Sequence, residues 1–110
     1  YLQDTGLLLP AHRRDDSHVF HLYVVRAERE LRDRLRKHLQ KRGILTAIQY
    51  PAPVHLTPAF SGLGYEPGAF PAAEQAAEEI LSLPMHIGMG EAQVAYVADA
   101  IRELTGKVAV

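Results

Sequence analysis

The stretch from Ile48 to Phe60, IQYPAPVHLTPAF, constrains the fold more than any other part of the sequence, because it holds prolines at positions 51, 53 and 58. Proline lacks a backbone N–H and fixes φ, so neither an interior strand nor the middle of a helix can run through these residues. The apolar run before them must therefore end at Pro51. A turn this stiff, which also carries a tyrosine and a histidine, is either only architectural or held rigid because something binds there.

The sequence before this stretch predicts a strand, a helix and a second strand. HVFHLYVVR (18–26) is apolar on both faces, which predicts an interior strand. Residues 27–43 predict an amphipathic helix with Leu31, Leu35 and Leu39 four residues apart, closed by Gly43 as a left-handed cap. ILTAIQY (44–50) predicts the second strand.

The sequence after this stretch predicts a loop with a short helical turn after Pro58, then a helix, a strand and a last helix. Pro71 opens the alanine-rich helix PAAEQAAEEIL, and LSLPM (81–85) is the short strand. The inward face of the last helix (91–104) is predicted to consist of Val94, Val97, Ala98, Ile101 and Leu104. This order predicts an α/β (α+β) fold, a two-layer domain with helices packed on a small sheet of about three strands. We expect residues 1–17 to be a connecting tail and loop, and residues 18–110 to be the domain.

The composition limits the classes of function. A chain of 110 residues with 47% apolar and 23% charged residues fits one globular domain. A formal net charge of −1 gives no global attraction to nucleic acid or to an anionic membrane, and no apolar run approaches the roughly 18 residues of a membrane span. The absence of cysteine agrees with a reducing compartment, so we expect a cytoplasmic protein. The chain starts at Tyr1 without a methionine, and we expect it to be a piece of a longer protein.

The six histidines predict no metal site. His18 and His21 are three apart on a predicted strand, so they should point to opposite faces. No HExxH or comparable spacing links His12, His55 and His86, which fall in predicted loops.

The helix over 27–43 is strongly basic. A nucleic-acid recognition helix and a solvated outer face are both open, and we favour the solvated face, with pairs such as Asp33 and Lys37. Between residues 28 and 42 seven basic residues outnumber three acidic ones. The basic residues are Arg29, Arg32, Arg34, Arg36, Lys37, Lys41 and Arg42. The three lysines of the whole chain (Lys37, Lys41 and Lys107) all lie where no burial is expected, so no catalytic residue is predicted.

Three blocks of the sequence resemble, in order and spacing, the carboxy-terminal domain of DegT/StrS-type sugar aminotransferases. These blocks are HVFHLYVVR, RGILTAIQYPAPVHLTPAF and LGYEPGAFPAAEQAAEEILSLPMHIGM, and the resemblance runs from about His18 to Leu104. It implies the small domain of a fold-type I enzyme that uses pyridoxal 5'-phosphate (PLP) and acts on nucleotide-linked keto sugars in amino-sugar biosynthesis. It also implies that the cofactor and its lysine belong to a missing amino-terminal domain, that this chain alone is inactive and binds no cofactor, and that the parent is a homodimer.

The same resemblance gives the opening turn a role. In the family this turn usually reads His-Tyr-Pro and lines the nucleotide-sugar side of the cleft, whereas here it reads Gln49-Tyr50-Pro51. It implies Tyr50, Gln49 and His55 as substrate-binding residues. Gln49 can donate and accept hydrogen bonds but cannot carry the positive charge of a histidine. A free-standing ligand-binding or regulatory domain without enzymatic activity is the alternative.

Overall fold

The computed structural model describes residues 1–11, 15 and 17–106. Helices accompany a small antiparallel sheet, which confirms the predicted α/β class. In chain order the elements are β1 (Tyr23–Arg26), α1 (Arg29–Lys41), the 3-10 helices η1 (Val54–Leu56) and η2 (Pro58–Leu63), α2 (Pro71–Glu79), β2 (Ile80–Leu83) and α3 (Glu91–Thr105).

The sheet is smaller than predicted. Strands β1 and β2 form one antiparallel pair, and single bridges extend it at both edges, from Leu8 to Arg26 and from Ala47 to Ser82. The segment 44–50 thus contributes one bridge instead of a strand. The edge residue Ala47 exchanges both of its backbone hydrogen bonds with Ser82 (2.7 and 3.1 Å) before the chain turns away.

The first strand begins five residues later than predicted. Phe20 has φ of 46°, in the left-handed region that interrupts an extended chain, and its N–H donates to Nδ1 of His18 (2.9 Å). His18 and His21 therefore lie before the strand, both exposed, and not on its two faces. The apolar pattern thus predicted the strand correctly only from Tyr23 onward.

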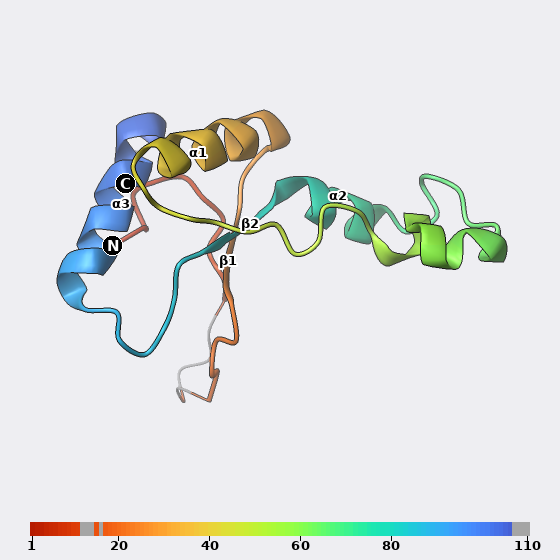
Figure 1. Ribbon diagram of the computed structural model, residues 1–110. Coiled ribbons are helices and arrows are strands. Elements are labelled where there is room, and N and C mark those ends of the chain that lie inside the picture. The colour runs from red at the N-terminus through yellow and green to blue at the C-terminus, as the bar shows by residue number, and fades with distance from the viewer. Residues whose placement is uncertain (12–14, 16, 107–110) are drawn as a thin grey trace.

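Helices α1 and α3 contact each other beside the sheet and enclose the core (Figure 1). Leu35 and Leu39 of α1 and Ile101 of α3 are fully buried, and Val25 and Leu81 of the strands are 1% exposed. These positions confirm both predicted apolar stripes. Leu7, near the amino terminus, is also part of this core.

One basic side chain of α1 departs from the predicted solvated face. Arg32 is only 6% exposed, and its Nη1 donates to the carbonyl oxygens of Ala77 (3.3 Å) and Ile80 (3.1 Å). These two carbonyls flank the junction where α2 passes directly into β2. Arg32 is thus a structural tie between α1 and that junction, while the other six basic residues counted on the helix are exposed as predicted.

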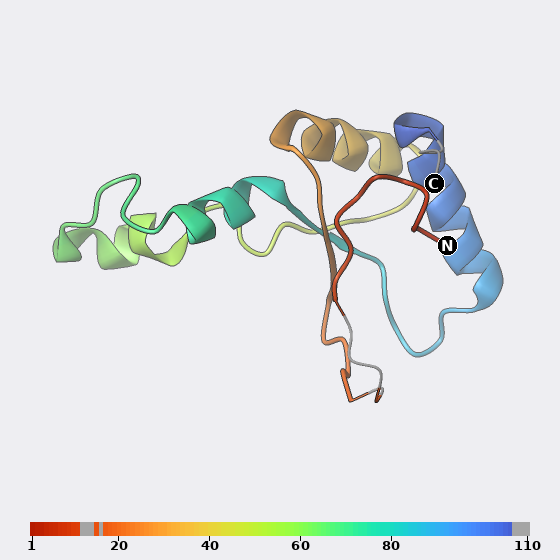
Figure 2. The ribbon, with the colours of Figure 1, turned by 180° about the vertical axis from the view of Figure 1, so that it is seen from behind.

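Residues 50–79, which we call the arm, project from the body that the other elements form. Figure 1 shows the two 3-10 helices, the following loop and α2 extending to one side, and the reversed view of Figure 2 shows the same separation. The radius of gyration is 15.7 Å, whereas a compact domain of this length has about 13 Å. The confirmed short helix after Pro58 (η2) and the helix opened by Pro71 (α2) both belong to the arm.

Replacing Leu35 by alanine should lower the free energy of unfolding by about 2–5 kcal/mol, because Leu35 lies on the core-facing side of α1 and is fully buried. Chemical denaturation of the variant and the wild type measures this difference. Leu45→Ala is the matched control: Leu45 is 78% exposed and should change stability by less than about 0.5 kcal/mol. Equal costs at the two sites would contradict the assignment of the core.

Candidate functional site

The turn singled out from the sequence lies where the chain leaves the sheet for the arm. Ala47 makes the last bridge to the sheet, and Gln49 and Tyr50 follow it in exposed positions. Tyr50 is 73% exposed, so its ring and hydroxyl are free to meet another molecule. Pro51 and Pro53 restrict the backbone behind it. The turn is therefore a stiff support for one exposed aromatic side chain.

His55, the third predicted site residue, is buried instead. Its side chain is 8% exposed and lies edge-on to two rings: Phe70 at 4.8 Å between centroids and Tyr65 at 6.3 Å. The rings of Tyr65 and Phe70 are themselves 5.0 Å apart. Such edge-to-face geometry is the favourable one for aromatic pairs. The structure thus places Gln49 and Tyr50 on the surface and His55 inside an aromatic cluster of the arm.

Glu74 completes this cluster, and the sequence reading did not single it out. Its Oε1 accepts the backbone N–H of Gly68 (2.7 Å), and its Oε2 accepts that of Phe70 (3.1 Å) and lies 3.4 Å from Nε2 of His55. The signal in the sequence was a glutamate one turn into a helix begun by proline, where a carboxylate can reach back to N–H groups before the helix.

The surroundings of Glu74 favour its ionised form. The hydrogen bond from the Gly68 N–H has the largest effect and lowers the pKa of the Glu74 carboxyl; desolvation opposes it, and the Phe70 N–H and His55 lower the pKa further. The ionised carboxylate holds the loop before α2 in place.

A hollow of about 340 Å³ lies beside the cluster and is lined almost entirely by apolar side chains. Val54, Phe60 and Leu63 line it together with His55 and the two rings, and these three are 65%, 44% and 64% exposed. Its chemistry suits packing against an apolar or aromatic surface.

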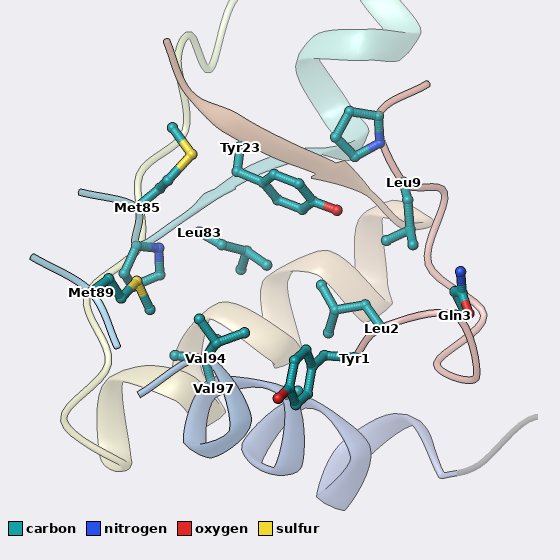
Figure 3. A pocket seen from close by; sticks show the side chains of 13 residues that line it. Tyr1, Leu2, Gln3, Leu9, Tyr23, Leu83, Met85, Met89, Val94 and Val97 are labelled. Carbon is teal, nitrogen blue, oxygen red and sulfur yellow. The ribbon is translucent and has the colours of Figure 1, made fainter. Parts of the chain in front are cut away.

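A second hollow, of about 390 Å³, lies on the body between the sheet and α3 (Figure 3). The Tyr23 ring faces Leu83, Val94 and Tyr1 across it, and Met85 and Met89 line one side. None of its lining residues is charged. It offers mainly apolar contact, and the hydroxyl groups of Tyr1 and Tyr23 are the titratable side-chain groups in its lining.

The described residues hold no cluster of three or more histidine or acidic side chains that could bind a metal. His38 lies on α1, 3.1 Å from Glu103, and His86 accepts the N–H of Gly88 (3.1 Å); His12 lies outside the described residues. Lys37 and Lys41 are exposed on α1, and Lys107 is also outside the described part. Among the helices described, none has the length and apolar character needed to cross a bilayer.

Residues 1–102 match the model of the DegT/DnrJ/EryC1/StrS aminotransferase family. The chain is 49% identical over 86 residues to the "Pleiotropic regulatory protein" of Geobacillus stearothermophilus, covering 78% of this chain and 23% of that protein. It is 45% identical over 103 residues to the dTDP-3-amino-3,4,6-trideoxy-alpha-D-glucose transaminase of Streptomyces venezuelae, covering 94% of this chain and 27% of that protein. The chain therefore spans about a quarter of the length of these relatives.

Solved structures share the fold, arm included. The crystal structure of S. venezuelae DesV in complex with a ketimine intermediate matches 97% of this chain and 28% of its own, with a TM-score of 0.85 and 43% identity. The PLP form of a putative sugar aminotransferase from Streptococcus pneumoniae matches 94% of this chain and 27% of its own, with a TM-score of 0.78 and 27% identity. An arm of this kind is thus found in much longer proteins.

Acidification should loosen the loop before α2. Because the folded structure lowers the pKa of Glu74, its stabilising contribution is complete above the usual range of a glutamate and is lost as the pH falls through the lowered pKa. The amide resonances of Gly68 and Phe70, followed by NMR from about pH 7 to about pH 3, should move together toward unfolded positions. The variant Glu74→Gln should show no such transition, and an identical transition in that variant would assign it to another group.

Proposed function

Because the chain belongs to the DegT/DnrJ/EryC1/StrS aminotransferase family, we propose that it is the small, carboxy-terminal domain of a PLP-dependent aminotransferase that acts on nucleotide-linked keto sugars. In this proposal the chain supplies a wall of the active-site cleft and no catalytic residue. The remaining three quarters of the parent hold the cofactor and its lysine.

The observation that carries this proposal is the 45% identity to a transaminase of a dTDP-linked sugar over 94% of the chain. Identity at that level extends through the body and the arm together. The shared fold of the DesV structure supports it further, because that protein holds a ketimine intermediate.

The residues of this chain do not fit PLP on their own. The cofactor supplies an electron sink for transamination and is held by a lysine. The two lysines that the structure describes, Lys37 and Lys41, are exposed on α1, outside the turn and the arm. In this proposal the chain therefore performs no step of the reaction, and its role is to bind the sugar nucleotide.

In this role Tyr50 presents a ring that can stack and a hydroxyl that can hydrogen-bond, a pairing common in ligand pockets. Gln49 adds a neutral amide that donates and accepts. His55 is buried behind the turn, where it packs against Phe70 and supports the wall without facing the ligand. The prolines fix the turn before the ligand arrives, so less conformational entropy is lost on binding.

Replacing Tyr50 by phenylalanine in the full-length enzyme should weaken sugar-nucleotide binding by about 0.5–1.5 kcal/mol, the typical value of one hydrogen bond. The Michaelis constant for the sugar nucleotide should rise while PLP loading stays unchanged. Tyr96→Phe is the matched control, because the Tyr96 hydroxyl donates to the Arg42 carbonyl (2.9 Å) on the body and not near the turn. Impaired PLP loading with an unaltered Michaelis constant would place Tyr50 on the wrong side of the cleft.

Borohydride reduction of the PLP-loaded full-length protein, followed by peptide mapping, tests both the division of roles and the placement. We expect one labelled lysine, upstream of residue 1 of this chain. A label downstream of residue 110 would place this chain at the amino-terminal end of the parent instead. A label on Lys37, Lys41 or Lys107 would contradict the non-catalytic role.

A regulatory domain is the second candidate, and the name of the Geobacillus relative, a pleiotropic regulatory protein, favours it. A regulator without enzymatic activity would show no labelled lysine anywhere in the full-length protein. The same experiment thus separates the two candidates.

A further inference from the structure

His55 is a buried titratable side chain, and its surroundings indicate a role beyond lining the apolar hollow of the arm. Its Nε2 is fully buried and makes no hydrogen bond within the described part of the chain, although it faces Oε2 of Glu74 at 3.4 Å. An unbonded buried ring nitrogen is costly, and a small approach of the two groups would satisfy it. The arm therefore holds a histidine and a carboxylate that are ready to bond.

Glu74 links this contact to the other end of the arm. The same carboxylate that faces His55 accepts the N–H groups of Gly68 and Phe70, so it joins the loop 64–70 to the start of α2. His55 itself lies in η1, which belongs to the outgoing part of the arm. Contact between His55 and Glu74 thus connects the outgoing and returning halves of the arm.

The position of His55 is transmitted to Tyr50 through a stiff backbone. Only four residues separate them, and two of these are the prolines Pro51 and Pro53. Proline restricts φ at each position, so fixing one end of this segment limits the positions open to the other. Ala47 is fixed at the sheet edge by its two hydrogen bonds to Ser82, which anchors the opposite side of the turn.

We propose that His55 and Glu74 form a clamp that holds the Tyr50 turn in place, and that His55 is a positioning residue for binding of the sugar nucleotide. His55 acts through the backbone of the turn and not by touching the substrate. The effect on the substrate rests on the proposed function, whereas the clamp itself does not.

Hydrogen–deuterium exchange of the full-length protein, read on peptides covering residues 49–56 and 64–70, tests the clamp. His55→Leu and Glu74→Gln should each raise the exchange rate in both peptides by roughly three- to tenfold, because local opening becomes easier. His55→Gln should restore most of the protection, since its amide can donate to Glu74. His38→Leu, which breaks the pair of His38 with Glu103 on the body (3.1 Å), should leave both peptides unchanged.

Wild-type exchange in His55→Leu would overturn the clamp. Failure of His55→Gln to restore protection would also overturn it, because ring packing alone would then explain the loss. Either result leaves the proposed function standing, since that is judged by Tyr50→Phe.

Kinetics of the full-length enzyme then test whether His55 acts through the turn. His55→Leu should raise the Michaelis constant for the sugar nucleotide about threefold or more and change kcat less than about twofold. In the double variant with Tyr50→Phe the two effects should be less than multiplicative, as expected for residues that act through one another. Fully multiplicative effects would show that His55 and Tyr50 act independently and would overturn the positioning role.

Discussion

The buried guanidinium of Arg32 fixes how the two parts of the molecule are joined. Helix α2 passes into β2 between Glu79 and Ile80 without a connecting loop, so carbonyl groups at this junction need partners in a region that is largely closed to water. Arg32 supplies them by donating to Ala77 and Ile80. The Nε of Arg32 is paired with Asp33 (2.7 Å), and its Nη1 would be left buried without an acceptor if the junction moved away. An unsatisfied buried donor is destabilising, which limits bending at the junction. Since α2 is the returning half of the arm, its direction relative to the core follows from this contact.

The helices were predictable from the sequence because their signals are local. The spacing of Leu35 and Leu39, the proline at position 71 and the glycine at position 43 each act within a turn or two of the backbone. Gly43 indeed has φ of 75° beyond the end of α1. The strands were less predictable, because a strand needs a partner: Phe20 is as apolar as Val25, but its positive φ and its place before the paired segment exclude it from the sheet.

The candidate site was predictable only in part for the same reason. The prolines and the exposed tyrosine of the turn can be read from one short stretch. The pairing of His55 with Glu74, and the hydrogen bonds from Arg32 to the carbonyls of Ala77 and Ile80, join residues far apart in the sequence, and no periodicity predicts them. In a single sequence Glu74 looks like an ordinary charged residue of a helix, and Arg32, although it falls on the same face of α1 as Leu35 and Leu39, looks like one more basic residue of a charged helix. Their true roles depend on which carbonyl and N–H groups the fold leaves without partners.

In the proposed function, the distribution of charge limits which parts of a nucleotide sugar this chain can contact. No lysine or arginine occurs between Gly43 and Ile101, and the arm contributes only carboxylates as charged groups, so it offers no fixed cation to a diphosphate. The turn carries the neutral Gln49 where a histidine could have carried a positive charge. The proposed function therefore assigns neutralisation of the diphosphate to other parts of the parent protein. What remains for the arm is stacking, apolar contact and neutral hydrogen bonding, which are the interactions that distinguish a nucleobase or a deoxygenated sugar ring and not the phosphates that all such substrates share. Under the proposed function, the arm would therefore contribute to the choice of sugar nucleotide more than to the general affinity for nucleotides.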